Sequence, residues 1–366
     1  MMHYDIVIIG AGCSGLSLAY EIVKQQKLDQ KIIIVDSKKE FVKDRTWSFW
    51  KILEHNFEDC LEKQWSKFSV QLNQKTKTLD QFQYPYQTIN SLKFYEKVKD
   101  VIQDKIEIKL DCKVESINQN NNDFEIKTHL GNISSKYILD TRSPKLETGQ
   151  LYQHFYGMEI ETEDQVFDEE IVNLMDFDCD QKDGVHFFYT LPFSKNKALI
   201  ETTWLSNIGH FDKNAYIEEL KNYILDRFPR AKNYKIIREE KGAIPMFRRQ
   251  VSNQKNYYDL GLRGNVNRMS TGYAFPYIQE QSQRIVKNLP HLGVISPISS
   301  KYEFLDRLFV KVLQNNFGKM PSIFFDIFQP SYQNEVIRFL SSKGTLSDDL
   351  KVILKMPKLL FLKNLI

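Results

Sequence analysis

The order of apolar and polar positions near the start of the chain predicts a strand, a helix and a second strand in close succession. Residues 4–9 form an apolar run of the kind that a buried parallel strand needs, and residues 31–35 form a second such run. Between them, residues 16–24 carry apolar side chains at helical spacing. The first strand opens into Gly10-Ala11-Gly12-Cys13-Ser14-Gly15. The pattern therefore predicts a βαβ unit with a glycine-rich turn.

Each glycine of this turn has its own task in a dinucleotide-binding unit. Gly10 would permit the tight turn, Gly12 would let the backbone approach a pyrophosphate, and Gly15 would let helix and strand pack closely. The pyrophosphate would sit at the helix N-terminus, where free N–H groups and the helix dipole favour an anion. Asp36, at the end of the second strand, is placed to accept hydrogen bonds from an adenosine ribose. The unit leaves FAD and NAD open, and the alternative is a small-residue turn in some other βαβ unit.

The segment that follows favours FAD. An amphipathic helix is predicted at residues 92–102. Short strands are predicted at residues 106–110, 113–117 and 123–128, and a buried strand at residues 136–142. These strands predict a three-stranded meander that returns to a buried strand, as in FAD domains of the glutathione reductase type.

A second, inserted sheet is predicted from about residue 151 to residue 240, where aromatic and polar residues alternate. Strand-like segments at residues 185–191 and 198–205 precede a helical pattern at residues 214–228. The pattern is mostly helical from residue 303 to the end of the chain.

These elements predict an α/β fold with an α+β insertion. It would comprise a Rossmann-type FAD-binding domain resembling glutathione reductase and p-hydroxybenzoate hydroxylase, an antiparallel-sheet substrate domain and C-terminal helices. The predicted FAD-binding domain is discontinuous and takes residues 1–60, 88–150 and 241–300. The predicted substrate domain takes residues 61–87 and 151–240, and the helical region takes residues 301–366.

Composition narrows the classes of protein and ligand. The chain has 366 residues, of which 42% are hydrophobic and 13% aromatic, so it supports sizeable cores and favours a large apolar ligand. A formal net charge of +3 gives no case for binding nucleic acid. The four cysteines are scattered without metal-ligand spacing, which favours a reducing compartment and predicts no metal site.

Two features bear on membranes. The predicted first strand begins almost at the amino terminus, leaving no room for a signal or transit peptide, and no apolar stretch approaches the ~20 residues of a spanning helix. We therefore expect a protein on the cytoplasmic side of a membrane, bound peripherally. Residues 351–366 mix apolar residues with lysines, as an interfacial helix would, and residues 304–328 offer a second apolar contact. The alternative is a C-terminal helix packed on the protein with its lysines in water.

Four segments, taken together with the glycine turn, resemble one family. Two are Asp44-Arg45-Thr46-Trp47-Ser48-Phe49-Trp50 and Tyr189-Thr190-Leu191-Pro192-Phe193-Ser194 with Ala198-Leu199-Ile200-Glu201-Thr202-Thr203. The others are Gly242-Ala243-Ile244-Pro245-Met246 with Ser270-Thr271-Gly272-Tyr273-Ala274-Phe275, and Phe304 to Leu313. Over nearly its whole length the chain resembles the flavoprotein-type lycopene cyclases, which close the ends of linear carotenoids into rings.

The resemblance implies a reaction without net redox change that depends on reduced FAD, with an external electron donor such as NAD(P)H. A proton adds to the terminal double bond of lycopene, an internal double bond attacks the resulting tertiary carbocation, and loss of a proton completes the ring. A hydrocarbon offers no hydrogen bonds, so its binding must come from apolar burial at about 25 cal/mol per Å². The acid would be held protonated by an apolar pocket, and aromatic faces would stabilise the cation.

The resemblance also implies roles for particular residues. Glu201 matches the glutamate that the family uses as its acid–base residue, and it would share a strand face with Leu199 and Thr203. Arg45 would neutralise charge on the flavin. The last strand–helix turn would bring its backbone near the flavin and pyrophosphate through Gly264, Thr271 and Gly272, and the aromatic residues Trp47, Phe49 and Trp50 would line the cavity.

The chain departs from the family pattern ahead of Thr271. Many relatives carry a His-Pro or similar pair there, whereas this chain has Gly264-Asn265-Val266-Asn267-Arg268-Met269. Arg268 thereby brings a permanent cation, for which a place beside a reduced, anionic flavin is one interpretation.

Other functions stay open. An FAD-dependent monooxygenase or an isoprenoid reductase would share fold and cofactor but transfer electrons to its apolar substrate, and a flavin-binding chaperone or redox sensor is the non-enzymatic alternative. Within the cyclases, the resemblance favours β rings over ε or γ rings. The number of ends cyclised and the oligomeric state stay open.

Overall fold

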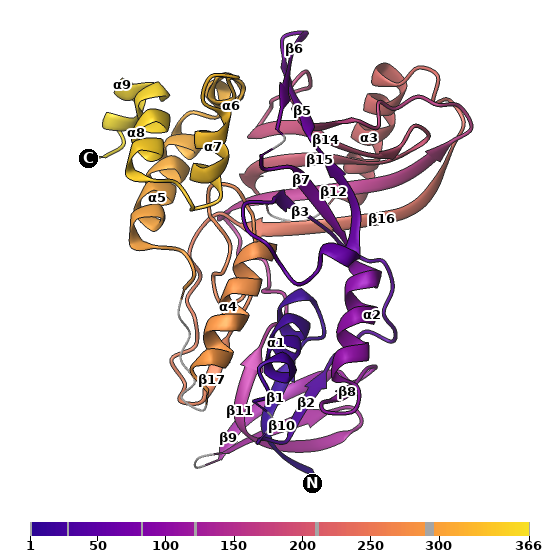
Figure 1. Ribbon diagram of the computed structural model, residues 1–366, viewed down its shortest axis with the longest axis vertical. Coiled ribbons are helices and arrows are strands. Elements are labelled where there is room, and N and C mark those ends of the chain that lie inside the picture. The colour runs from indigo at the N-terminus through magenta and orange to yellow at the C-terminus, as the bar shows by residue number, and fades with distance from the viewer. Residues whose placement is uncertain are drawn as a thin grey trace.

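The computed structural model describes residues 2–27, 29–81, 83–120, 123–208, 212–289 and 296–365. Its elements form three groups (Figure 1). The sheet built around the first strand lies at the end of the molecule that carries the amino terminus. The second sheet, built around β12 and β15, lies beyond it, and the C-terminal helices pack beside this second sheet.

The first sheet has the strand order β8-β2-β1-β11-β10-β9, with β17 paired to β11. Its strands are β1 (Met2–Ile9), β2 (Ile32–Val35), β8 (Glu107–Lys109), β9 (Val114–Asn120), β10 (Asp123–Thr128), β11 (Gly131–Asp140) and β17 (Tyr257–Asp259). The helices α1 (Cys13–Lys24), α2 (Ser91–Ile102) and α4 (Phe275–Lys287) belong to the same group. The predicted βαβ unit is confirmed.

Burial on both faces explains why β1 reads as an apolar run rather than an alternating one. Ile6 and Ile8 belong to the core shared with α1, α2 and α4. Val7 belongs to a second core that includes Phe124 and Ile126 of β10.

The predicted meander is wrong in one strand. The strand predicted at residues 106–110 is β8, which pairs in parallel with β2 through Ile34 and Ile108 at the opposite edge of the sheet. The antiparallel meander consists of β9, β10 and β11 instead. The reason is that β8 follows β2 through a long connection that ends with α2, and such a crossover connection brings the next strand back parallel to the first.

The second sheet has the order β16-β12-β15-β14-β13-β5-β6. Its strands are β5 (Lys67–Leu72), β6 (Lys75–Asp80), β12 (Leu151–Thr162), β13 (Ile171–Asp176), β14 (Val185–Ser194), β15 (Lys197–Asn207) and β16 (Tyr234–Pro245). All neighbours pair antiparallel except β13 and β5, so the predicted antiparallel sheet is confirmed with one parallel pair.

The two faces of this sheet have different partners. On β12, Tyr156 and Met158 pack in a core with α3 (Lys213–Arg227), whereas Gln153 and Phe155 line a cavity on the other face. Because successive strand residues point to opposite faces, the aromatic–polar alternation of the sequence reflects these two environments.

A small sheet, β3-β7-β4, and the C-terminal helices complete the fold. The strands are β3 (Thr46–Trp50), β4 (Leu61–Trp65) and β7 (Tyr86–Asn90), and a short 3-10 turn, η1 (Glu58–Cys60), precedes β4. The helices are α5 (Ser300–Asn315), η2 (Phe317–Lys319), α6 (Met320–Ile327), α7 (Gln333–Leu340), α8 (Leu346–Lys355) and α9 (Lys358–Leu362). The boundaries of the three predicted domains stay a prediction.

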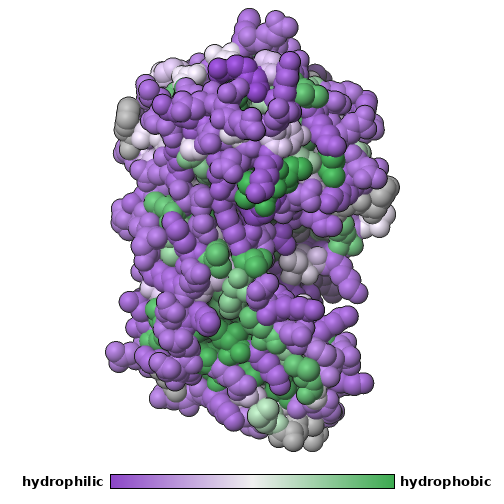
Figure 2. Space-filling model, turned by 90° about the vertical axis from the view of Figure 1, so that its right-hand side faces the viewer, coloured by the Kyte–Doolittle hydropathy of each residue, from purple (hydrophilic) through white to green (hydrophobic). Residues whose placement is uncertain are grey.

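The side of the molecule that carries α2 and β16 is mostly hydrophilic in its upper half, and apolar residues gather in its lower half (Figure 2). Every helix in the described ranges falls short of the length and apolar content needed to cross a bilayer.

Candidate active site

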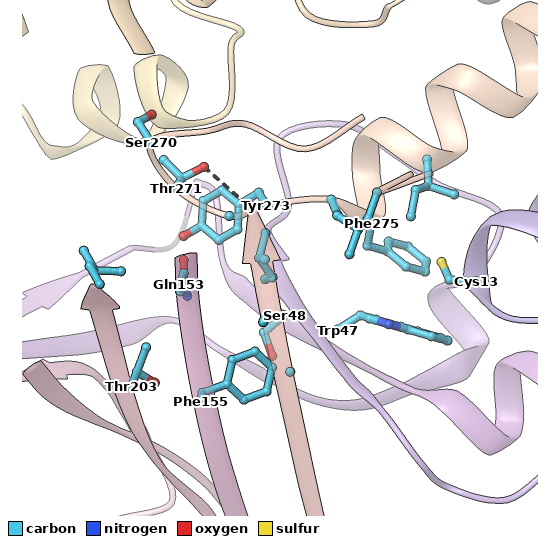
Figure 3. Close-up of a pocket in the computed structure, with 18 of the residues that line it drawn as sticks. Cys13, Trp47, Ser48, Gln153, Phe155, Thr203, Ser270, Thr271, Tyr273 and Phe275 are labelled. Atoms are coloured by element: carbon cyan, nitrogen blue, oxygen red, sulfur yellow. Dashed lines mark hydrogen bonds between the residues drawn. The ribbon is translucent and has the colours of Figure 1, made fainter. Parts of the chain in front are cut away.

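One continuous cavity of about 1320 Å³ connects the glycine turn to the second sheet and the C-terminal helices. Ligand pockets usually measure about 300–1,000 Å³, so this cavity can hold more than one ligand. Figure 3 shows Gln153, Phe155 and Thr203 rising from the sheet strands, the Ser270–Tyr273 turn opposite them, and Trp47, Phe275 and Cys13 toward α1.

One end of the cavity is built by the glycine turn. Gly10 has a φ of +110°, and a Cβ on Gly15 would overlap the carbonyl oxygen of Gly10, so both positions need glycine. Gly12 is the N-cap of α1 and lines the cavity, and within the described residues no side chain caps this helix. The N–H groups at the start of α1 thus meet the requirements of an anion site.

Asp36 lies beside this turn on the cavity wall. Its Oδ2 accepts a hydrogen bond from the backbone N–H of Ala11 at 2.6 Å, and its Oδ1 accepts one from the N–H of Lys38 at 2.8 Å. The carboxylate therefore orders the glycine turn, and its remaining acceptor capacity suits ribose hydroxyls. The donor and acceptor set at this end fits an adenine dinucleotide, and the role of Asp36 stays a prediction.

The turn before α4 contributes two of its three predicted residues to the cavity wall. Thr271 and Gly272 line the cavity. Gly272 has a φ of +72°, and a Cβ there would overlap the side-chain oxygen of Gln153, so this glycine brings the turn against β12. Gly264 does not line the cavity. It packs against the backbone carbonyl of Asp259, and a Cβ at this position would overlap that oxygen.

Arg268 does not have the position that the sequence suggested. Its guanidinium is fully buried and forms a two-pronged ion pair with Asp306 of α5, with distances of 2.8 and 2.7 Å. It also donates to the carbonyl of Phe339 and to Ser342, and it lies over the ring of Tyr302. The cation is therefore neutralised inside the protein, where it joins the turn before α4 to α5 and α7.

Asp306→Ala is expected to lower the free energy of unfolding by about 3–5 kcal/mol, because it leaves the Arg268 guanidinium buried without its counter-charge. Urea denaturation followed by circular dichroism measures this. Glu115→Ala, which removes the exposed Glu115–Lys127 pair, is the control and should leave stability unchanged within error. A small effect at Asp306 would contradict this account of the ion pair.

Arg45 and Trp47 both lie on the cavity wall. Arg45 Nη1 donates to the backbone carbonyl of Lys241 at 2.9 Å, which holds the guanidinium at the edge of β16. Trp47 stacks on Phe275 with ring centroids 5.7 Å apart. Phe49 and Trp50, expected at the cavity, are 3% and 2% exposed and belong to the core beside it. Of the three predicted aromatic residues, Trp47 alone lines the cavity.

Glu201 lies in the middle of β15, on the cavity face of the sheet. Leu199 and Thr203 share this face, as the strand alternation predicted, whereas Ile200 packs with α3 on the other face. The residue is 7% exposed. Burial raises the pKa of Glu201 well above its ordinary value, the charge and hydrogen bond of nearby Glu240 raise it further, and Arg238 acts in the opposite direction. Glu201 thus meets the requirements of an acid that keeps its proton at neutral pH.

Three tyrosines that we did not single out from the sequence lie near this acid. Tyr86, Tyr189 and Tyr273 all line the cavity, and the hydroxyl of Tyr189 donates to that of Tyr86 at 2.9 Å. Burial raises the pKa of all three hydroxyls well above the ordinary value, so they stay neutral. Neutral aromatic rings next to an acid provide the electron-rich faces that a carbocation requires. The alternation of β14 is the signal that could have placed Tyr189.

The far end of the cavity is apolar and is formed largely by the C-terminal helices. Their lining residues include Leu305, Leu308, Phe309, Ile323, Phe324, Ile327, Phe328, Phe339, Leu340 and Val352. From the sequence we expected helices here, with Phe317, Phe324, Phe325 and Phe328 near the mouth of a cavity. Phe324 and Phe328 line it, whereas Phe317 and Phe325 are not among its lining residues.

Comparisons with known proteins agree with this arrangement. The family model described as "Lycopene cyclase protein" matches residues 5–365. The chain is 23% identical to a lycopene beta-cyclase of Pantoea ananas, covering 97% of this chain and 95% of that protein. It is 25% identical to a chloroplastic neoxanthin synthase of Solanum tuberosum, covering 74% of this chain and 57% of that protein.

Solved structures show a similar fold at low sequence identity. A geranylgeranyl bacteriochlorophyll reductase-like protein from Thermoplasma acidophilum covers 99% of this chain and 98% of its own, with a TM-score of 0.67 and 10% identity. The halogenase PltM in complex with phloroglucinol and FAD covers 92% of this chain and 79% of its own, with a TM-score of 0.55 and 12% identity. The fold is that of FAD-dependent oxidoreductases.

Proposed function

This chain belongs to the lycopene cyclase family, and on that premise we propose that it closes the linear ends of lycopene into β-ionone rings. The reaction would be proton-initiated, would need reduced FAD, and would cause no net redox change. An external donor such as NAD(P)H would keep the flavin reduced. The observation that carries the proposal is a buried carboxyl group, Glu201, in an apolar cavity that continues to the glycine turn.

The cofactor half of the proposal assigns FAD to the wall around the glycine turn. The residues that would bind it or shape its site are Gly10, Gly12, Gly15, Asp36, Arg45, Gly264, Thr271 and Gly272. Supporting this, α1 offers free N–H groups to a pyrophosphate, and Asp36 offers carboxylate oxygens to a ribose. Reduced FAD, when bound, would supply negative charge near the developing cation.

Glu201 would donate its proton to the terminal double bond of lycopene, which leaves a tertiary carbocation and a carboxylate. An internal double bond then closes the ring, and the carboxylate takes a proton from the ring carbon. The faces of the tyrosine rings would stabilise the cation between these steps. The apolar residues of the C-terminal helices would bind the rest of the hydrocarbon and exclude water, which would otherwise trap the cation as an alcohol.

Extraction of pigment from lycopene-making cells that express this chain tests the activity. A cyclase gives a product with the mass of lycopene and a changed absorption spectrum, and chromatography against standards distinguishes β, ε and γ rings at one or both ends. A product that has gained hydrogen or oxygen would instead indicate a reductase or a monooxygenase of the same fold. Unchanged lycopene in cells that contain the folded, flavin-loaded protein would contradict the proposal.

We also propose that the C-terminal helices contact the membrane in which the substrate resides. Several leucines of α8 and α9 are exposed, and two of them, Leu354 and Leu362, also line the cavity, so this surface lies at the apolar end of the cavity. These exposed side chains are Leu350 (58%), Leu354 (59%), Leu359 (77%) and Leu362 (56%). Lys355, Lys358 and Lys363 lie close to them in the sequence and suit an anionic lipid surface.

Flotation with anionic liposomes tests this contact. Simple removal of residues 351–366 would also delete Val352, which is buried in the core, so substitution is the sharper test. Replacing Leu354, Leu359 and Leu362 with serine should weaken liposome binding by about 3 kcal/mol. The estimate takes roughly 1 kcal/mol for each leucine side chain that is half buried in the lipid.

A matched triple substitution provides the control. Leu225, Ile236 and Ile237 are 54%, 41% and 41% exposed and lie on α3 and β16, away from the C-terminal helices. Their replacement with serine should leave flotation unchanged. Equal flotation of both triple variants, or a parent protein that stays at the bottom of the gradient, would contradict membrane contact through α8 and α9.

A further inference from the structure

Strand β12 carries a glycine between two acidic residues of its neighbouring strands. Gly157 pairs with Glu201 of β15 on one side and with Glu240 of β16 on the other. Residues directly opposite each other in antiparallel strands point to the same face, so both carboxyl groups rise from the cavity face, and both line the cavity.

The glycine keeps the space between the two carboxyl groups open. A Cβ on Gly157 would lie 2.8 Å from Cγ and 3.1 Å from Oε1 of Glu201, so any larger residue would displace this side chain. Glu201 therefore leans over Gly157 toward β16, where the charge of Glu240 and a hydrogen bond to it would raise the pKa of Glu201.

Glu240 has the partners of a carboxylate. Arg238 Nη1 donates to its Oε2 at 2.5 Å, and the hydroxyl of Thr46 donates to the same oxygen at 3.0 Å. The side chain is 3% exposed, so its charge depends on these donors. Arg238 is itself held by Glu159, with Nε and Oε2 3.0 Å apart. These donors are the partners that a carboxylate needs, and they lie next to Glu201.

We propose that Glu240 is the positioning residue of a carboxyl–carboxylate pair, in which it accepts a hydrogen bond from protonated Glu201 and holds the transferable proton there between turnovers. The role deepens the proposed cyclisation and rests on it for the ring-closure step. Two carboxyl groups this close share one proton, because both cannot ionise in a buried site.

The pair would act at both proton transfers of the proposed reaction. In the first, the O–H bond of Glu201 breaks and a C–H bond forms on the terminal double bond, which leaves a cation on the substrate and two carboxylates on the sheet. Their two charges favour the adjacent cation in a water-poor cavity. In the second, a ring C–H bond breaks, its electrons form the ring double bond, and the proton returns to Glu201. The mutual repulsion of the carboxylates favours this return.

Other titratable groups around the pair do not replace Glu240 in this role. Tyr189 of β14 and Tyr86 of β7 face Glu201 and stay neutral, because burial raises the pKa of both. The charged groups beyond Arg238 compensate one another, and Arg238 connects them to Glu240 through Glu159. These groups are Glu159 with Lys43 and Lys197, and Glu62 with Lys43.

Infrared titration of the purified protein tests the pair without substrate. The parent should show the carbonyl stretching band of a protonated carboxyl group at neutral pH, and Glu201→Gln should remove that band. In Glu240→Gln the band should titrate at a midpoint about 2 pH units lower, since the like charge is gone. The high-pH limb of ring-closure activity should move in the same direction and by the same amount.

Two further variants separate pairing from general disturbance. Gly157→Ala changes no charge but wedges a methyl group between the carboxyl groups, so it should also lower the midpoint. Glu239→Gln is the matched control: it lies next to Glu240 on β16, is 35% exposed and pairs with Lys213, so it should titrate as the parent does.

The two proposals fail in different ways. A parent protein without the Glu201 band at neutral pH would overturn the pair, as would a parent-like midpoint in either folded variant, Glu240→Gln or Gly157→Ala. Should Glu240→Gln not fold, Gly157→Ala decides the outcome. A normal infrared result together with unchanged lycopene in cells would leave the pair intact and contradict the cyclase function alone.

Discussion

Glu201→Gln is expected to lower the rate of ring closure by about 10²–10⁴-fold, the usual contribution of a general acid–base group. An amide has nearly the size and shape of a carboxyl group, so the strand, the cavity and the bound flavin should be retained. It cannot release a proton to an alkene, however. The measurement is the initial rate of β-ring formation by purified, reduced enzyme on lycopene in liposomes, with flavin content determined for each preparation.

The pH dependence follows from the same group. As the proposed acid, Glu201 would act in its protonated form, and burial raises its pKa. Activity should therefore persist through neutral pH and fall as the pH rises through this raised pKa. Glu239→Gln, on the opposite face of β16, should keep parental activity. Activity of Glu201→Gln within a few-fold of the parent would exclude Glu201 as the acid.

Gly12→Val is expected to remove bound FAD while leaving the fold in place. A Cβ at Gly12 would meet no atom of the described residues within 4 Å, and the backbone there is extended (φ −93°, ψ −166°), which valine adopts readily. The cost to the helix N-cap is only about 1 kcal/mol. The isopropyl group would occupy the space where a pyrophosphate approaches the N-terminus of α1, so the protein should purify without the flavin absorbance band.

Gly318→Val is the matched control, because a Cβ at this glycine also meets no described atom within 4 Å and it lies in η2, in the C-terminal helical region. It should purify with the same flavin content as the parent. Gly15 is unsuitable for this experiment, since any side chain there would overlap the backbone of Gly10 and disturb folding. Full flavin content in Gly12→Val, or a parent that is colourless and takes up no added FAD, would contradict the cofactor assignment.

Local patterns predicted what depends on near neighbours in sequence. The strand–turn–helix unit follows from residues 4–36 alone, because the glycines and the strand act within one short segment. The face of Glu201 followed from strand alternation, because side chains of one strand alternate regardless of the partner strands. The family resemblance implied that Trp47, Phe49 and Trp50 line the cavity, but it did not show that Phe49 and Trp50 pack in the core instead.

Pairing between distant segments was decided by the tertiary structure. The partner strand of β8 depends on the direction in which the chain returns after α2. The spacing of apolar residues along the chain carries no information about that direction. Arg268 became a buried structural cation because α5 brings Asp306 to it, and no residue near it in sequence indicated that pairing.

The sequence by itself determined the family, the fold class and the glycine turn, and its motifs led us to propose Glu201 as the acid, because all of these depend on short contiguous segments. The register of three strands decided the rest of the acid's surroundings: Gly157 lies between Glu201 and Glu240, although the three residues come from different parts of the chain. The physical reason is that a pKa depends on burial and on charges a few ångströms away. Those neighbours are assembled by long-range strand pairing, which a local pattern of apolar and polar residues does not specify.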